Sequence, residues 1–200
     1  EILFFTSRGI GWLSVNYRGS AGFGRAYQEA LHGRWGEVDV EDAAAAVQAL
    51  AASGWADPQR LALYGSSAGG LTVLNTLIRH PGLTRAAICK YPVSELLSLN
   101  DSTHKFELHY NDWLLGKLPE AAARYRERSP LYRAAEIRSP LALFHGGQDP
   151  VVPLAQSQQI AAAITAAGGS CRLTVYPQEG HGFRQVETLE DFYAKFLDFL

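Results

Sequence analysis

Short apolar runs alternate with longer stretches of helical character along this chain. The runs are almost continuously apolar and do not alternate with polar residues, which is typical of strands buried on both faces of a parallel sheet. We therefore expect five strands, at residues 11–17, 60–64, 86–90, 141–145 and 172–176.

The stretches between these runs have the boundaries of helices. Acidic residues lie near the start of residues 38–53, and two glycines follow residues 154–167, as is typical of helix ends. We expect helices at residues 38–53, 70–79, 154–167 and 188–200. Alternating strands and helices predict right-handed βαβ units, and therefore one α/β domain with a mostly parallel sheet flanked by helices.

Residues 93–138 interrupt this alternation. We interpret them as a helical insertion between two strands, because they include the helix-like stretch 120–128. Aromatic side chains are scattered through the insertion: Phe106, Tyr110, Trp113 and Tyr125. They either line a pocket or form a local core, and we favour the core for most of them.

Composition narrows the class of protein. The chain has 200 residues, 47% hydrophobic and 19% charged, which suits one globular domain and excludes a disordered chain. A net charge of −2 provides no basic surface for nucleic acid or an anionic membrane. No run reaches the ~18 to 20 apolar residues that a spanning helix needs.

Cysteine content and the start of the chain bear on its compartment. Cys89 and Cys171 lie in apolar strand-like runs, so we expect buried free thiols and no metal site. The first residues lack a charged region and a cleavage site, so we expect no signal peptide and a cytoplasmic protein. The chain begins without methionine, in the middle of a pattern, and we interpret it as a piece of a longer protein.

The most specific chemical motif is Gly65-Ser66-Ser67-Ala68-Gly69. It follows a predicted strand and precedes a predicted helix, and in that context G-x-S-x-G is a nucleophile elbow. We expect glycines 65 and 69 to let the strand and the helix approach closely. Ser67 would then stand on a strained corner at the positive end of the helix.

A serine nucleophile needs a base, and the base needs an acid to orient it. In α/β-hydrolases they follow in the order serine, acid, histidine. His181 and Asp149 satisfy this order, and each comes just after a predicted strand, at the carboxyl edge of the sheet. We interpret the acidic residues of the insertion (93–138) as lying on solvent-exposed helix faces and not in the site. Glu179 competes less well because it is two residues from His181, and His145 at a strand end is interpreted as packing.

Four segments, residues 15–27, 33–42, 65–70 and 180–183, resemble the catalytic domain of the prolyl oligopeptidase family. The likeness extends from about Phe4 to the C-terminus and is greatest to the acylaminoacyl peptidase and dipeptidyl peptidase-like branch. It implies an α/β-hydrolase fold over residues 1–200, without its N-terminal strands. It also implies Ser67 as nucleophile, Asp149 as acid and His181 as base, with no cofactor or metal.

The resemblance implies partners as well. Members of the family usually carry an N-terminal β-propeller that filters peptide substrates, and we expect one in the longer protein. A homo-oligomer is left open.

The chain departs from the family pattern around the oxyanion. A His-Gly-Gly segment that usually supplies part of the oxyanion hole is missing, and Phe23 stands where some relatives carry a donating tyrosine. We assign the backbone N–H of Ala68 as an oxyanion donor and Phe23 to the rim of the site. Arg18 either orients a substrate carbonyl or forms a buried ion pair that holds its loop, and we favour the ion pair.

These residues support one leading function and two alternatives. The leading hypothesis is a serine peptidase that acts on short peptides through an acyl-enzyme. The first alternative is a carboxylesterase that uses the same triad. The second is a non-catalytic hydrolase-fold module used for binding, against which the intact set of Ser67, Asp149 and His181 argues.

Overall fold

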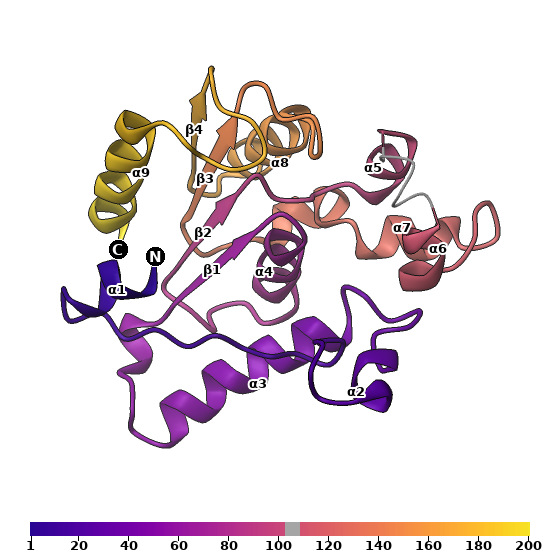
Figure 1. The fold of residues 1–200 in the computed structure, drawn as a ribbon, viewed down its shortest axis with the longest axis horizontal. Coiled ribbons are helices and arrows are strands. Elements are labelled where there is room, and N and C mark those ends of the chain that lie inside the picture. Colours follow the sequence, from indigo (N-terminus) through magenta and orange to yellow (C-terminus); the bar gives the residue numbers. More distant parts are fainter. Residues whose placement is uncertain (103–108) are drawn as a thin grey trace.

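Four parallel strands form the sheet at the centre of the computed structural model, which describes residues 1–102 and 109–200 (Figure 1). Their order in the sheet equals their order in the chain: β1 Ala62–Ser66, β2 Ala86–Lys90, β3 Leu141–Gly146 and β4 Cys171–Tyr176. All three pairings are parallel, so the carboxyl ends of the strands lie along one edge.

The two central strands, β2 and β3, are buried on both faces. Cys89 and Leu143 contribute to the apolar core on one face, and Ile88 and Phe144 contribute to the core on the other. The expectation of strands covered on both sides is confirmed for β2 and β3. In β1 and β4, at the two edges of this sheet, most residues are only partly buried.

Helices cover both faces of the sheet (Figure 1). One face is covered by α4 (Ala68–Arg79) and α8 (Ala155–Ala166), the other by α1 (Ile2–Thr6) and α9 (Val186–Phe199). A further helix, α3 (Val38–Ala52), packs against α4. The four predicted helices are confirmed as α3, α4, α8 and α9, with ends within two residues of those expected.

The chain between β2 and β3 is helical and extends away from the sheet (Figure 1). Tyr125 is fully buried among apolar side chains there, as expected of a core residue. Trp113 is half-buried, Tyr110 is 54% exposed, and Phe106 lies outside the described residues. The elements of this segment are α5 Leu96–Ser102, α6 Tyr110–Leu115, α7 Ala122–Arg128 and the 3-10 helix Pro130–Glu136.

The part of the chain before β1 also contains α2 (Arg25–Glu29) and a 3-10 helix at Pro58–Arg60. The second explains why β1 begins two residues later than predicted. Asp57 caps this turn by accepting the N–H of Gln59, so Arg60 belongs to a helix and not to the strand.

The predicted strand at residues 11–17 is wrong. These residues run from α1 towards α2 with no strand assignment, although their sequence is apolar (Figure 1). A strand needs a neighbour for its backbone N–H and C=O groups, and within the described residues β1 pairs only with β2. Leu13 and Val15 are accordingly 54% and 37% exposed, while the Trp12 ring packs on Phe5.

The cysteines are free, as expected. Cys89 is buried and Cys171 is half-buried, and burial raises the pKa of both thiols, that of Cys171 to about 12. No helix of residues 1–102 and 109–200 is long and apolar enough to cross a membrane.

Candidate active site

Ser67 occupies the sharp turn between β1 and α4 with φ 54° and ψ −121°. Such a backbone costs a non-glycine residue on the order of 1–3 kcal/mol, so neighbouring contacts must hold it. The last residue of β2 and the chain just after it provide them. The Ser67 N–H donates to the carbonyl of Lys90 (3.0 Å), and the Val93 N–H donates to the carbonyl of Ser67 (3.3 Å).

The glycines of this turn do not share one role. A Cβ on Gly65 would collide with the carbonyl of Gly69 and with Val73, so the first glycine allows β1 to approach α4. A Cβ on Gly69 would meet nothing within 4 Å, so the expectation that the close approach requires a glycine at this position is wrong. Gly70 is the tight position instead, because a Cβ there would collide with Pro92.

Ser67, His181 and Asp149 form one hydrogen-bonded chain. His181 Nε2 lies 3.1 Å from Ser67 Oγ, and His181 Nδ1 lies 2.8 Å from Asp149 Oδ2. A carboxylate only accepts, so Nδ1 carries the proton and Nε2 presents its lone pair to the serine hydroxyl. Asp149 lies in the acid loop (147–152) after β3, and His181 in the histidine loop (177–183) after β4.

The Asp149 carboxylate is held on both oxygens. Oδ1 accepts the N–H groups of Val151 and Val152, each at 2.9 Å, and Oδ2 accepts His181. Burial by itself would raise the pKa of Asp149. The hydrogen bonds from His181, Val152 and Val151 outweigh burial and hold that pKa below its usual value. The carboxylate is therefore ionised and aimed at the imidazole.

Backbone contacts fasten the acid loop to the histidine loop. The Gly147 N–H donates to the carbonyl of Tyr176 and the Gln148 N–H to that of Glu179, both at 2.8 Å. A Cβ on Gly146 would collide with the Glu179 carbonyl, so a glycine is required where the loops meet. The separation of Asp149 and His181 is thus determined by backbone packing as well as by their own hydrogen bond.

Glu179, the rival acid, has other partners. Its carboxylate accepts the N–H groups of Arg184 and Gln185, at 2.8–3.1 Å, just before α9 begins. Burial raises its pKa, but the bonds from Gln185 and Arg184 more than offset burial and keep the pKa below its usual value. Glu179 holds the turn into α9 and does not orient the imidazole.

Three further residues were considered for the site from the sequence: Ala68, Phe23 and Arg18. Ala68 begins α4, so its N–H has no intrahelical partner, as an oxyanion donor requires. Phe23 is 56% exposed and packs on Tyr27, with ring centroids 5.4 Å apart, and its place at the rim stays a prediction. Arg18 forms an ion pair with Asp42 at 2.8 Å and is partly exposed, so it anchors its loop to α3.

Sequence reasoning missed Tyr91, which directly follows β2. Its backbone has φ 36°, and its ring lies 4.4 Å from the ring of His181. The Tyr91 N–H donates to the carbonyl of Phe144 at 2.7 Å, which holds the residue against β3. The rule that located Asp149 and His181, a position just after a parallel strand, would also have found Tyr91.

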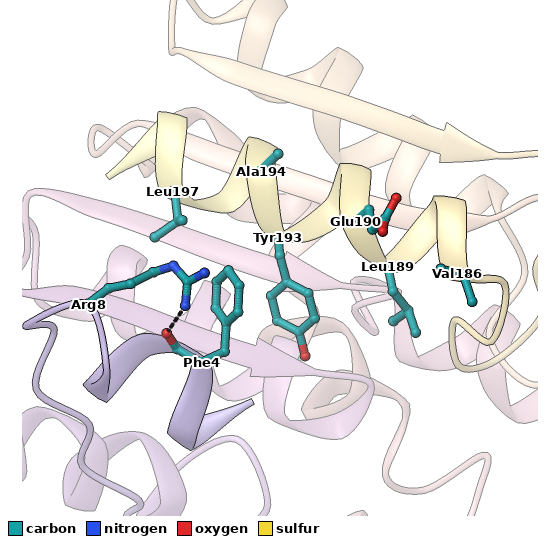
Figure 2. Close-up of a pocket in the computed structure, with 8 residues that line it drawn as sticks. All are labelled: Phe4, Arg8, Val186, Leu189, Glu190, Tyr193, Ala194 and Leu197. Atoms are coloured by element: carbon teal, nitrogen blue, oxygen red, sulfur yellow. Dashed lines mark hydrogen bonds between the residues drawn. The ribbon is translucent and has the colours of Figure 1, made fainter.

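An apolar hollow between α1 and α9 lies apart from this chemistry. Figure 2 shows the rings of Phe4 and Tyr193 side by side in it, and Arg8 donating to the Phe4 carbonyl at 2.9 Å. No member of the Ser67–His181–Asp149 chain lines the hollow. Among the described residues no group of three or more histidines, cysteines or acids is arranged to hold a metal ion.

Comparison with known proteins places this geometry in context. A model of the prolyl oligopeptidase family matches residues 1–200. Dipeptidyl aminopeptidase BIII of Pseudoxanthomonas mexicana is 32% identical over 196 residues, 96% of this chain and 28% of that protein. The acylamino-acid-releasing enzyme of Sus scrofa is 30% identical over 194 residues, 92% of this chain and 26% of that protein.

A solved structure is similar over nearly the whole chain. The puromycin-hydrolyzing peptidase of Mycobacterium tuberculosis has a TM-score of 0.96 and 44% identity. The match covers 99% of this chain but 30% of that one, so the chain spans less than a third of the length of these relatives. The parallel sheet and this likeness confirm the α/β-hydrolase fold.

Proposed function

Since this chain belongs to the prolyl oligopeptidase family, we propose that it is the catalytic domain of a serine peptidase. Ser67 Oγ attacks the carbonyl carbon of the scissile bond while its proton passes to His181 Nε2. His181 then gives that proton to the leaving amine, and an acyl-enzyme remains on Ser67. Water hydrolyses the acyl-enzyme by the same route, with His181 again as the base.

The observation that carries this proposal is the continuous chain Ser67–His181–Asp149, with distances of 3.1 and 2.8 Å. Asp149 keeps the proton on Nδ1 and stabilises the imidazolium that forms when Ser67 is deprotonated. The N–H of Ala68 lies at the positive end of α4, and we assign it to stabilise the oxyanion.

We propose short peptides and aminoacyl amides as the substrate class. The relatives are named for dipeptidyl aminopeptidase, acylamino-acid-releasing and puromycin-hydrolyzing activities. Two of these names refer to a peptidase, and the third to the release of an acylamino acid. Amide hydrolysis thus has stronger support here than ester hydrolysis.

We propose that the natural protein contains more than this domain. The relatives are more than three times as long as the part that this chain matches, which leaves room for an N-terminal β-propeller and for further strands. Residues 11–17, which belong to no helix or strand here, are suited to join the sheet once such strands are present. The two free thiols favour the cytoplasm, which fractionation of cells would test.

Labelling with a fluorophosphonate tests the nucleophile in the full-length protein. We expect covalent modification at Ser67 and no labelling of Ser67→Ala. Labelling should be almost completely lost in His181→Ala, because removal of one member of a triad costs nearly as much as removal of all three. Labelling of the Ser67→Ala variant at the rate of the unmodified protein would overturn the assignment. Lack of any labelling in the folded protein would favour a non-catalytic module.

Substrate comparison separates peptidase from esterase. We expect the full-length protein to release nitroaniline from aminoacyl-nitroanilides and to cleave puromycin, with both activities lost in Ser67→Ala. Turnover of nitrophenyl esters alone would identify a carboxylesterase instead.

A further inference from the structure

A second histidine lies near the Asp149 oxygen that binds His181. His145, in β3, is fully buried, and its Nε2 is 3.5 Å from Asp149 Oδ2. We propose that His145 is a positioning residue that holds Asp149 in place for His181. The proposal rests on the proposed function, because it assigns His145 a part in the same site.

The partners of His145 determine where its proton lies. Nε2 lies 2.9 Å from the carbonyl of Val152, and a carbonyl only accepts, so Nε2 carries the hydrogen. Nδ1 lies 2.7 Å from Ser157 Oγ on α8. Burial lowers the pKa of His145, so the ring is neutral and the hydroxyl of Ser157 donates to Nδ1.

Val152 connects this histidine to Asp149. Its carbonyl accepts from His145, and its N–H donates to Asp149 Oδ1 at 2.9 Å. The residue that closes the acid loop is thus held from both sides, by the ring of His145 and by the carboxylate of Asp149. Loss of the ring would release Val152 and with it one of the groups that aim Asp149 at His181.

The Nε2–H of His145 also acts on Asp149 directly. At 3.5 Å it is too distant for a strong hydrogen bond, but the positive edge of the ring faces a carboxylate that is shielded from water. The contacts run from Ser157 through His145 and Asp149 to His181 and Ser67, so His145 contacts the triad at its carboxylate. An apolar side chain would fill the same space without this alignment.

Four segments place polar or aromatic side chains against His145: the acid loop, the histidine loop, the residue after β2, and α8. Asp149 faces it from the acid loop and His181 from the histidine loop, and both act on its charge. Tyr91, after β2, packs edge-on with ring centroids 6.4 Å apart, and Ser157 approaches from α8. Asp149 is the one anion among these groups, so a change at His145 acts on the site through Asp149.

Two substitutions in the full-length protein test the proposal, with the rate of fluorophosphonate labelling at Ser67 measured from pH 5 to 9. His145→Leu keeps the volume and removes both nitrogens. We expect labelling to slow by about 10- to 100-fold, the scale of a small misplacement in a catalytic group. His145→Gln retains a donor that reaches the Val152 carbonyl, so we expect a rate close to that of the unmodified protein.

Rescue by the conservative variant distinguishes positioning from a general loss of stability. If the ring only fills space, labelling should slow in both variants or in neither, and melting temperature records any loss of stability. A His145→Leu variant that labels at the original rate, or a His145→Gln variant that labels as slowly as His145→Leu, overturns the proposal and leaves Ser67 as nucleophile.

Failure of the proposed function has a different signature. If the unmodified protein is not labelled at Ser67, both proposals fall together. If His145→Leu does not fold, nitrogen NMR of the folded unmodified protein decides the matter. We expect the hydrogen of His145 to lie on Nε2 at pH 7 to 9, because Nε2 faces the Val152 carbonyl, and the opposite tautomer would overturn its role.

Discussion

Two buried carboxylates near His181 differ in what they bind, and that difference assigns their roles. Asp149 accepts the imidazole N–H at 2.8 Å, whereas Glu179 accepts backbone N–H groups from Arg184 and Gln185. The first contact bears on the orientation of the base, and the second on how the chain enters α9. Substitution should therefore affect activity in one case and stability in the other.

Asp149→Asn should abolish most activity and preserve the fold. The amide is close in size to the carboxylate, but it does not select the tautomer of His181 with hydrogen on Nδ1. In an unrelated triad such a change costs on the order of 10⁴-fold in rate. We expect a similar fall in kcat/KM for an aminoacyl-nitroanilide in the full-length protein, with melting temperature as the control for folding.

Glu179→Gln should show the converse. We expect a loss of about 1–3 kcal/mol in the free energy of unfolding, because an ionised acceptor of several backbone N–H groups becomes neutral. Most of kcat/KM should remain, since the imidazole keeps Asp149. Chemical denaturation and steady-state kinetics measure the two effects. A large fall in kcat/KM for Glu179→Gln, together with an unchanged kcat/KM for Asp149→Asn, would reverse the assignment of the acid.

At the scale of elements, the close approach of β1 and α4 requires glycine at only one of the two glycine positions of the serine motif. Gly65 faces the carbonyl of Gly69 and the side chain of Val73, whereas Gly69 itself faces open space. Within α4, glycine is also a poor helix former compared with alanine, by about 1 kcal/mol. The two glycines should therefore respond oppositely to the same substitution.

Gly65→Ala should destabilise the protein and impair labelling of Ser67, because the added methyl group forces β1 and α4 apart. Gly69→Ala should leave stability unchanged or raise it by up to about 1 kcal/mol, with labelling retained. Denaturation midpoints and fluorophosphonate labelling of the two variants check this pair. Equal damage from both would show that the second glycine has a steric role that its surroundings do not reveal.

A buried arginine fastens the helical segment between β2 and β3 to the chain before α3. Arg128 is 7% exposed, donates to the carbonyls of Gly33 and Trp35 at 2.9 Å, and pairs with Glu37 at 2.9 Å. Burial is the main cause of its lowered pKa, and Glu37 partly offsets it. Removal of the cation would leave these acceptors without their donor.

Arg128→Met should lower the free energy of unfolding by about 2–4 kcal/mol, because buried acceptors and an anion lose their partner. Arg126→Met is the matched control. Arg126 lies on the same helix, is exposed and stacks on Tyr132, so its loss should cost about 0.5 kcal/mol or less. Denaturant midpoints compare the two. A similar small effect at both positions would contradict the anchoring role of Arg128.

For the whole molecule, buried and paired carboxylates determine how stability depends on pH. Asp149, Glu179 and Asp42 have pKa values below their ordinary 3.8 or 4.5. Each therefore contributes stability above its unfolded pKa, and the contribution is lost as pH falls through the folded pKa. Asp39 opposes them, because burial raises its pKa and its ionisation disfavours the fold at neutral pH.

Three of these four carboxylates have lowered pKa values and only Asp39 has a raised one. The free energy of unfolding should therefore be highest near pH 6–7 and fall between about pH 5 and pH 3. Denaturation midpoints at a series of pH values test this. Asp149→Asn should show a shallower fall, because one contributing group is removed. A protein whose stability rises as the pH drops from 5 to 3 would contradict the balance of pKa shifts.

Local sequence patterns predicted much of the architecture. β2 lies where the apolar run 86–90 predicted it, and α3 begins at the expected residue with acidic side chains in its first turn. Residues 11–17 have the same kind of pattern and form no strand, because pairing also needs a neighbouring backbone. Apolar sequence predicts burial, but a partner strand is a property of the assembled sheet.

The sequence by itself identified Ser67, Asp149 and His181 as the proposed triad. The order of Ser67, Asp149 and His181, each just after a strand, follows from the chain and from the rule that parallel strands end at one edge. Only the tertiary structure decided the contacts. Ser67 and His181 are 114 residues apart in the chain, and His145, Tyr91 and the partners of Glu179 join or leave the site through packing between loops. Periodicity and order are local properties of a chain, whereas a distance of 3 Å between remote atoms depends on how all the intervening elements pack.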